Sequence, residues 1–474
     1  RVTGAEELCP EKTGILGPCR VIPQEYLNVT CRVIDIESPS ADGWRRERLV
    51  AQLAEELGDG GSDLSIAYRG GERWVQIFEP VRLEPGPGAT RFRTGGVYLI
   101  TGGLGAMGLV LARHLAVAHR ARLVLVGRTV PPLGAEGSRW IEAHGAGDRV
   151  SRQIRALQEL EERGAEVCVV AADVADEEAM RGAVERAVER FGTLHGVIHA
   201  AGITGERFFF PIQEMERETC EQHFRAKVHG LLALDAALRG RDLDFCLLQS
   251  SLSTVLGGLA FSAYVAANGF MDAFAHKRAQ DGPRTWISVD WDSWHLTEGT
   301  DTGTEFGATV AEYAMTPEEG AATLERVLAT GAGPQVIHST GDLESRIDQW
   351  LRLAGAGQAE HRGPVHERPR LTNPYVAPGS PTEERIATIW EEILGLAPVG
   401  IHDDFFEIGG HSLLATRVFT RLRAVFHVAL PLRTLFETAT VAGLAGLVDT
   451  ILWAGQGQRS LVPELVADRE EIEI

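Results

Sequence analysis

Thr101-Gly102-Gly103-Leu104-Gly105-Ala106-Met107-Gly108 joins the apolar run Val97–Thr101 to an amphipathic stretch, Ala106–Ala118. Glycines in this pattern let a backbone turn tightly and approach a pyrophosphate, whose charge is met by the amides at the start of a helix. A glycine cluster by itself also fits an ordinary tight turn. The segment therefore predicts a strand, a glycine-rich turn and a helix, and its role depends on the neighbouring segments.

Short apolar, β-branched runs recur between residues 94 and 340, separated by helical stretches such as Ser151–Arg163. The predicted strands are Val97–Thr101, Leu123–Val126, Val167–Ala171, Val197–Ala200, Leu243–Gln249, Trp286–Trp291 and Gln335–His338. Strands alternating with helices indicate crossover units and a parallel sheet covered on both faces. The predicted fold class is therefore α/β, a Rossmann-type doubly wound parallel sheet. Thr129–Val150 contains Pro and Gly and is expected to be an irregular surface insertion.

The chain has 474 residues, which is enough for several domains. Residues 94–353 hold the predicted sheet. Residues 1–93 form a smaller unit with predicted strands Val29–Asp35 and Trp74–Phe78 and a predicted helix Leu49–Leu57. Three elements make a thin core. We therefore expect this unit to pack on its neighbour or to be the remnant of a domain truncated at its N-terminus.

A second folded region follows the sheet. Residues 354–379 are rich in Gly, Pro, Glu and Arg and predict a linker. Residues 380–453 have helical periodicity at Pro381–Leu394, Leu413–Ala424 and Val441–Leu452, which predicts a small all-α helical bundle. Residues 454–474 form an acidic C-terminal tail.

Composition excludes several classes of partner. The net charge of −20 would repel nucleic acid and anionic lipid, and no stretch approaches the roughly 20 apolar residues of a membrane span. We therefore expect no nucleic-acid and no membrane partner. The six cysteines are scattered without a CxxC pair, which argues against disulfides and a zinc site and favours a cytoplasmic location.

The ends of four successive predicted strands carry residues suited to a dinucleotide. Arg128 stands where an enzyme using NAD would carry an acidic residue for the ribose diol, so it favours the 2′-phosphate of NADP. Asp173 is placed to contact the adenine, and the small residues after His199 let the backbone pass close to the cofactor. The candidate cofactor-binding residues are Thr101, Gly102, Gly103, Leu104, Gly105, Met107, Gly108, Arg128, Thr129, Asp173, Val174, Ala200, Ala201 and Gly202.

A second constellation could donate a proton. Ser251 ends the fifth strand, Tyr264 lies 13 residues later, and Asn268 shares a helix face with Tyr264. A free tyrosine has a pKa near about 10, so it needs a nearby cation to act near neutral pH. Lys227 is one of only three lysines in the chain. Each residue taken alone also fits a structural role, and Ser250 is the alternative to Ser251.

These residues resemble the short-chain dehydrogenase/reductase superfamily, and more closely the ketoreductase domains of modular polyketide synthases. The superfamily places Lys four residues after Tyr, whereas ketoreductase domains place Asn there and Lys on the preceding helix, as Asn268 and Lys227 stand here. The resemblance implies hydride transfer from NADPH to the ketone of a β-ketoacyl thioester. Tyr264 would donate the proton, Ser251 would bind the oxyanion, and Lys227 would hold the ribose and lower the pKa of Tyr264, with Asn268 ordering the network.

The same resemblance extends to other segments. Gly17–Asp35 and Ala67–Pro80 resemble the truncated structural subdomain of such ketoreductases, and Trp294–Tyr313 would be a substrate lid. A Leu-Asp-Asp motif marks one hydroxyl configuration in the family, and a Trp eight residues before Tyr marks the other. The first region reads Ile203-Thr204-Gly205-Glu206 here and the second position is Leu256, so neither is present. The missing Asp motif gives a weak preference for the L-hydroxyl product.

Asp404-Phe405-Phe406-Glu407-Ile408-Gly409-Gly410-His411-Ser412-Leu413-Leu414 resembles the attachment site of acyl and peptidyl carrier domains. A serine at a helix N-terminus suits an attached phosphodiester, although it also fits a simple N-cap. The resemblance implies 4′-phosphopantetheine on Ser412, added by a phosphopantetheinyl transferase. Gly-Gly-His-Ser is closer to peptide-synthetase carriers, which suggests a hybrid polyketide–nonribosomal peptide synthase.

The implied partners are an acyl-phosphopantetheine substrate, upstream ketosynthase and acyltransferase domains, and a downstream condensation or ketosynthase subunit. The tail Leu461–Ile474 could be a docking peptide for that subunit or a solvated terminus. Two alternative functions stay open: reduction of an α-ketoacyl group in a depsipeptide-forming synthetase, and a catalytically inert reductase fold beside a working carrier.

Overall fold

The computed structural model describes most of the chain. The described residues are 2–4, 6–26, 29–37, 43–58, 61, 63–84, 91–203, 205, 208–282, 286–296, 313–352, 366–369, 371, 373–410, 412–428, 430, 434–435 and 438–459. The chain divides between residues 357 and 358 into two compact units. Most of the expected lid Trp294–Tyr313, most of the expected linker 354–379 and residues 460–474 of the tail lie outside the described residues.

The first unit is built on a seven-stranded sheet in the order β10-β9-β8-β7-β4-β5-β6, and every neighbouring pair of strands is parallel. The strands are β4 (Val97–Thr101), β5 (Arg122–Gly127), β6 (Val167–Ala171), β7 (Gly196–His199), β8 (Phe245–Ser251), β9 (Trp286–Trp291) and β10 (Gln335–Ile337). The order reverses beside β4, so the carboxyl ends of β4 and β7 flank the crevice where a doubly wound sheet binds its ligand. The predicted fold class is confirmed.

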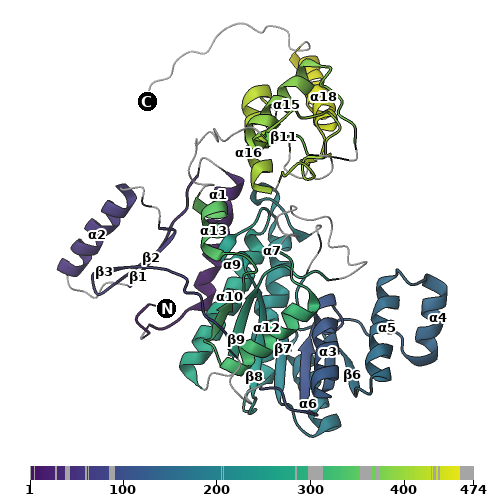
Figure 1. Ribbon diagram of the computed structural model, residues 1–474. Coiled ribbons are helices and arrows are strands. Elements are labelled where there is room, and N and C mark those ends of the chain that lie inside the picture. The colour runs from purple at the N-terminus through teal and green to yellow at the C-terminus, as the bar shows by residue number, and fades with distance from the viewer. Residues whose placement is uncertain are drawn as a thin grey trace, which may run out of the picture. The chain divides into compact units, whose positions relative to one another are not determined.

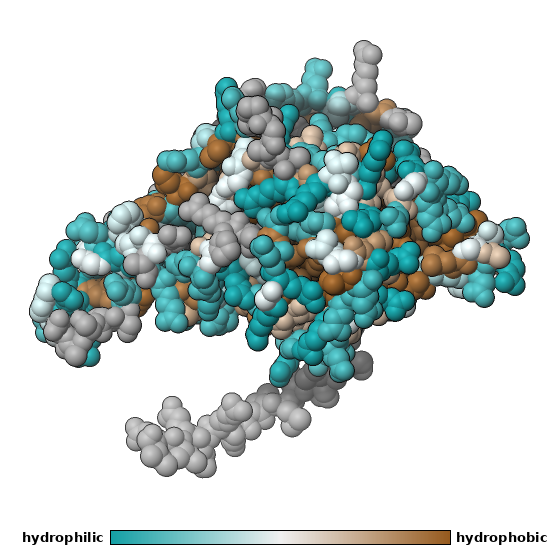
Figure 2. All heavy atoms as spheres, turned by 90° about the horizontal axis from the view of Figure 1, so that it is seen from below, coloured by the Kyte–Doolittle hydropathy of each residue, from teal (hydrophilic) through white to brown (hydrophobic). Residues whose placement is uncertain are grey.

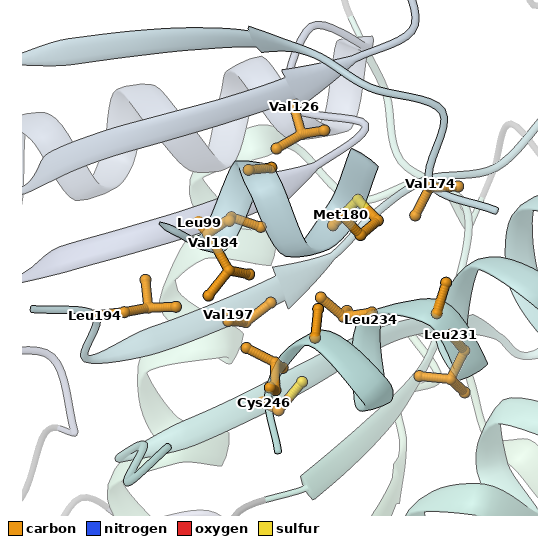
Figure 3. Close-up of a cluster of buried hydrophobic side chains, with 14 of the residues drawn as sticks. Leu99, Val126, Val174, Met180, Val184, Leu194, Val197, Leu231, Leu234 and Cys246 are labelled. Carbon is orange, nitrogen blue, oxygen red and sulfur yellow. The ribbon is translucent and has the colours of Figure 1, made fainter. Parts of the chain in front are cut away.

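Helices cover both faces of this sheet (Figure 1). On one face α3 (Ala106–His119), α5 (Arg149–Glu162) and α12 (Pro317–Thr330) pack on residues such as Tyr98 and Ile198. On the other face lie α6 (Glu177–Phe191), α8 (Gly230–Ala237) and α10 (Ser262–Asp281). Figure 3 shows Leu99 and Val197 of the sheet among Met180, Val184 and Leu234 of those helices. Burial on both faces explains why the strands read as continuous apolar runs.

Several short elements of the first unit lie around the carboxyl edge of the sheet. They are η3 (Ile212–Glu214), α7 (Arg217–Phe224), η4 (Arg225–His229), α9 (Ser253–Leu256), α13 (Leu343–Ile347) and η5 (Asp348–Arg352). The η4 segment is a π-helical turn between α7 and α8. Hydrophilic residues cover most of the molecular face drawn in Figure 2, with hydrophobic residues in separate groups.

Residues 1–93 hold more structure than the sequence predicts. A parallel pair, β1 (Val33–Ile36) and β2 (Ser65–Arg69), continues antiparallel into β3 (Glu72–Val75), next to α2 (Gly43–Gly58). The sequence analysis missed β2 and also η1 (Pro10–Ile15) with α1 (Leu16–Glu25), whose glycines and prolines suggest a loop. Helix α1 packs against α10 so closely that a Cβ on Gly17 would lie 2.2 Å from the Ser262 carbonyl oxygen.

The prediction of an irregular insertion at Thr129–Val150 was wrong in part, because α4 (Gly134–His144) lies within it. The indole of Trp140 stacks on His144, with 4.0 Å between the ring centroids, and its Nε1 donates a hydrogen bond to Asp148 at 3.0 Å. Asp148 also caps α5 by accepting from the Ser151 amide. These local side-chain contacts stabilise a short helix that apolar periodicity alone does not reveal.

The second unit contains the predicted bundle. Helices α15 (Pro381–Leu394), α16 (Ser412–Phe426) and α18 (Val441–Arg459) pack around a core that includes the buried side chains of Trp390 and Phe405. Ser380 and Glu383 form a reciprocal capping box at the start of α15. A two-residue strand, β12 (Leu396–Ala397), pairs with β11 (His366–Glu367), so the unit is not entirely helical. Among the described residues of the whole chain, no helix is both long and apolar enough to span a membrane.

Candidate active site and carrier attachment site

The glycine-rich turn after β4 brings three backbone segments together. Gly102 has a φ of +66°, and a Cβ there would lie 2.6 Å from the Ala200 carbonyl oxygen at the end of β7. A Cβ on Gly108 would lie 2.4 Å from the Gly102 carbonyl oxygen. At position 102 only glycine tolerates both the positive φ and the close approach of the Ala200 carbonyl oxygen. The turn predicted from sequence therefore has the geometry that lets a backbone close on a bound pyrophosphate.

The turn also leaves the start of α3 without a side-chain cap. Gly105 is the N-cap residue of α3, and it contributes no side-chain hydrogen bond to the helix. The amides of the first helical turn have no intrahelical acceptor, and the helix dipole makes this end positive. The helix spans 14 residues, from Ala106 to His119. This arrangement fits the diphosphate of a dinucleotide.

The other candidate cofactor residues lie at the same edge of the sheet. The hydroxyl of Thr101 lies 2.8 Å from His199 Nδ1 and links the ends of β4 and β7. Arg128 follows β5 and is exposed. Asp173 follows β6 and forms an ion pair with Arg225, with 2.8 Å between the charged atoms. Leu104 and Val174 are buried structural residues of this edge. The structure thus brings the predicted set to one edge, and it adds Arg225, which the sequence analysis did not consider.

Lys227 reaches the site from the π-helical turn. Its side chain is 7% exposed, its Nζ donates to the Gln249 carbonyl oxygen at 3.0 Å, and Nζ lies 5.6 Å from the ring centroid of Tyr264. A Cβ on Gly202 would lie 3.4 Å from Lys227 Cε, so the ammonium stands beside the end of β7. Burial lowers the pKa of Lys227 to about 8, although the charge of Asp272 opposes this change. π-Helical turns are frequent at functional sites.

Tyr264 lies on the first turn of α10 among aromatic rings. The rings of Phe209, Phe261 and His223 have their centroids within 5.8 Å of the Tyr264 ring centroid. Burial raises the pKa of the Tyr264 phenol, and hydrogen bonding to Ser251 and Asn268 opposes the rise. Asn268 is fully buried and donates through Nδ2 to the Tyr264 carbonyl oxygen at 2.8 Å. The four predicted residues therefore meet at one place.

The structure distinguishes Ser251 from Ser250. Ser251 is the last residue of β8, where its hydroxyl interacts with the Tyr264 phenol and accepts from the Ser253 amide at 3.2 Å. Ser250 is 5% exposed and stands opposite Asp290 in the β8–β9 register, which places it on the sheet face that α10 covers. The geometry favours Ser251 as the hydroxyl of the site.

Sequence reasoning missed two residues that hold the segment before Tyr264. Gln24 donates to the Leu256 carbonyl oxygen at 2.6 Å and accepts from the Gly258 amide at 2.8 Å. The Glu25 carboxylate accepts from the Ala260 amide at 3.0 Å and from the Ile212 amide at 2.8 Å. Because both residues end α1, a helix absent from the sequence prediction, no sequence signal singled them out.

One group of described residues outside the site has the composition of a metal site. His114, His119 and Glu325 place their ligand atoms within 4.8 Å of one another. Both Nε2 atoms lie within hydrogen-bond distance of the same Glu325 oxygen, at 2.9 Å from His114 and 2.5 Å from His119. Hydrogen bonding accounts for this approach, and we assign no metal to it.

Ser412 is the first residue of α16 in the second unit. In the loop before Ser412, Gly409 has a φ of +95°. A Cβ on Gly410 would lie 2.4 Å from the Phe405 carbonyl oxygen. Phe405 is fully buried in the core of the bundle. The glycines thus let the loop turn tightly against the core and deliver Ser412 to a helix N-terminus, which is a favourable place for a phosphodiester.

Together, the doubly wound sheet, its glycine turn and the cluster around Tyr264 define the fold of the short-chain dehydrogenases and reductases. Residues 96–296 match the family model of the KR domain, and residues 384–448 match that of the phosphopantetheine attachment site. The chain therefore contains a ketoreductase domain followed by a carrier domain, the combination found in modular polyketide synthases.

Known proteins support this assignment. The chain is 31% identical to polyketide synthase PksM of Bacillus subtilis over 67% of its own length, and it spans 7% of the length of PksM. A ketoreductase domain from the bacillaene assembly line superposes with a TM-score of 0.59 and 28% identity, covering 73% of this chain and 78% of that one. A keto acid-selecting nonribosomal peptide synthetase module superposes with a TM-score of 0.58 and 26% identity, covering 75% of this chain and 28% of that one.

Proposed function

We propose that the chain catalyses the NADPH-dependent reduction of a carrier-tethered β-ketoacyl thioester to the β-hydroxyacyl thioester. One observation carries the proposal: the Lys227 ammonium lies 5.6 Å from the ring centroid of Tyr264. Tyr264 in turn interacts with Ser251 at the carboxyl end of the sheet. An ammonium, a phenol and a hydroxyl at this edge supply what a ketone needs when a hydride converts it into an alkoxide.

NADPH supplies the hydride in this proposal. Tyr264 donates a proton to the developing alkoxide, and Ser251 hydrogen-bonds the same oxygen as negative charge builds up on it. Lys227 stabilises the phenolate left on Tyr264 and would hold the nicotinamide ribose of a bound cofactor. Asn268 fixes the first turns of α10 through its bond to the Tyr264 carbonyl oxygen. The proton and the hydride together convert the ketone into a secondary alcohol.

The preference for NADPH rests on Arg128. Its guanidinium is exposed just after β5, the strand whose end meets the adenosine ribose in this fold. A guanidinium offers a planar, permanently charged donor for a 2′-phosphate. Replacing Arg128 with Asp should weaken NADPH binding more than NADH binding, as measured by titration of the nucleotide fluorescence. Equal effects on the binding of the two nucleotides would show that Arg128 does not select NADPH over NADH.

The substrate reaches the site on the carrier domain in this proposal. Ser412 takes 4′-phosphopantetheine from coenzyme A through a phosphopantetheinyl transferase, and the thiol of that arm carries the acyl chain. Upstream ketosynthase and acyltransferase domains would build the chain, and a downstream condensation or ketosynthase subunit would receive it. The acidic tail is a candidate docking peptide for that subunit.

Reduction of an α-ketoacyl thioester is the second candidate function. The similarity to a ketoreductase within a keto acid-selecting synthetase module favours it, and so does the resemblance of Gly-Gly-His-Ser to peptide-synthetase carriers. A turnover assay that compares β-keto and α-keto thioesters, followed by chiral analysis of the product, decides between the two. The proposal expects faster NADPH oxidation with the β-keto substrate and an L-hydroxyl product. Nucleotide binding without turnover of either substrate would favour the inert reductase fold.

A further inference from the structure

Two aspartates lie in the interior beyond the predicted active-site residues. Asp272 follows Tyr264 and Asn268 at intervals of four residues, so all three share one face of α10. Asp290 lies on β9, opposite Ser250 of β8. The side chains of Asp272 and Asp290 are 5% and 0% exposed. In the described part of the chain, neither carboxyl group has a basic ion-pair partner within 4 Å, although buried carboxylates ordinarily need one.

Hydroxyl and amide donors bind one oxygen of each carboxyl group. Ser288 donates to Asp272 Oδ1 at 2.6 Å. Thr254 donates to Asp290 Oδ2 at 3.1 Å, and Gln335 Nε2 donates to the same oxygen at 2.7 Å. The other oxygen, Asp290 Oδ1, is buried and has no hydrogen-bond donor among the described residues. A buried acceptor without a donor is costly, so this oxygen needs a proton.

The missing proton fits between the two carboxyl groups. Asp272 is a direct neighbour of Asp290, and both burial and this neighbouring carboxylate raise the pKa of Asp290 well above its ordinary value. Two carboxylates in contact in a buried site cannot both be ionised. If Asp290 keeps its proton, the two groups form a hydrogen bond and Oδ1 no longer lacks a partner. The pair then carries a single negative charge, on Asp272.

Lys227 is a buried cation next to this pair: its Nζ donates to the carbonyl oxygen of Gln249, and the next residue of β8, Ser250, stands opposite Asp290. Burial favours the neutral amine of Lys227, and the negative charge of Asp272 favours the ammonium. Two histidines also lie near the pair or near Lys227. His276 shares Gln335 with Asp290 through a contact of 3.1 Å to Gln335 Oε1. His199, beside Lys227, is fully buried, and burial lowers its pKa to about 3, so it is neutral.

We infer that Asp272 and Asp290 share one proton and act as the fixed counter-ion that keeps Lys227 protonated in the interior. Asp272 is thus a positioning residue that acts on the reaction through Lys227. Asp290 carries the shared proton, so Asp272 can remain ionised. The link to turnover rests on the proposed function of Lys227, whereas the shared proton does not.

Two asparagine variants separate the roles of the aspartates. An asparagine amide has one acceptor oxygen and an N–H donor, so at position 290 it imitates the protonated carboxylic acid. Asp290→Asn therefore leaves the charge on Asp272 and should keep the wild-type pH profile of kcat/KM for ketone reduction. Asp272→Asn removes the charge, so Lys227 loses its proton more readily. The alkaline limb of the profile should then move to lower pH by about one pH unit.

Coincident profiles for wild type and both variants would overturn the counter-ion role. A shift in Asp290→Asn of the same size as that in Asp272→Asn would overturn the assignment of the charge to Asp272. Circular dichroism verifies that both variants are folded before their profiles are compared.

A spectroscopic measurement tests the shared proton without any turnover. Exposed carboxyl groups are ionised at pH 7, and any C=O stretch from another buried carboxyl group, such as that of Glu25, is common to the wild type and the variant. The infrared spectrum of the full-length wild-type chain should therefore contain one additional C=O stretch, from the protonated carboxylic acid of the pair. That band should be absent from Asp290→Asn. A wild-type spectrum without the band would overturn the inference, even if the chain reduces ketones. A spectrum with the band from a chain that reduces no ketone would contradict the proposed function instead.

Discussion

Replacing Lys227 with methionine should abolish ketone reduction and at the same time stabilise the fold. The ammonium of Lys227 is buried, and its pKa falls from 10.5 to about 8. At pH 7 this difference corresponds to a destabilisation of about 3 kcal/mol by the buried charge. Methionine has a similar length and no charge to desolvate, and the lowered pKa of Lys227 already includes the attraction of Asp272 that the variant loses. Loss of the hydrogen bond to Gln249 offsets about 1 kcal/mol of this stabilisation. The free energy of unfolding should therefore increase by about 2 kcal/mol.

Thermal unfolding followed by circular dichroism measures this gain. For a domain of this size, about 2 kcal/mol raises the midpoint by about 4 °C. The sign of the pH dependence provides a second criterion. Between pH 8 and about 10.5 the unfolded chain keeps a proton that folded Lys227 has released, so wild-type stability should rise with pH in this range. The Lys227→Met variant should lose that rise.

Lys277→Met is the matched control, because Lys277 is a half-buried lysine on α10 outside the proposed site. It should change neither NADPH oxidation nor the pH dependence of stability. If Lys227→Met lowers the unfolding midpoint, or if it keeps wild-type turnover, Lys227 is not the desolvated cation on which the mechanism depends.

Three further variants test other parts of the account. Gly102→Ala should abolish NADPH binding in a fluorescence titration, because its Cβ would lie 2.6 Å from the Ala200 carbonyl oxygen at a φ of +66°; undiminished binding would contradict the glycine-turn geometry. Ser251→Ala should lower kcat about 100-fold or more with little change in KM, as steady-state kinetics would measure, because it removes a donor to the developing oxyanion. Ser412→Ala should prevent the mass increase of one phosphopantetheine arm after treatment with coenzyme A and a phosphopantetheinyl transferase, and a retained increase in intact mass would place the arm elsewhere.

The sequence predicts the sheet well because its strands are buried on both faces. Such strands read as continuous apolar runs, and β4, β6 and β9 have the bounds that these runs predict. Helices that depend on particular contacts are harder to predict. Helix α1 contains Pro23 and docks on α10 through Gly17, so its residues resemble a loop. Helix α4 depends on the stacking of Trp140 on His144, which has no periodic signal.

In the candidate site, too, some features can be predicted from the sequence and others depend on contacts in the folded chain. Helical spacing places Tyr264 and Asn268 on one face, and the scarcity of lysines draws attention to Lys227. The resemblance to ketoreductase domains is what assigns their roles. Their convergence depends on a π-helical turn that no sequence pattern indicates. Asp290 could not be recognised, because an aspartate within a strand reads as an exposed polar position. Only the register of β8 and β9 places it in the interior beside Asp272.

Transfer of a labelled hydride tests the central claim most directly. The full-length chain, loaded with a β-ketoacyl phosphopantetheine, is incubated with NADPH that carries deuterium at the transferable position of the nicotinamide. Mass spectrometry of the released product should show one deuterium on the carbon that bears the new hydroxyl group, and Tyr264→Phe should yield no labelled product. NADPH that binds to the wild-type chain but leaves the ketone unreduced, or a Tyr264→Phe variant that labels the product at the wild-type rate, would contradict the account.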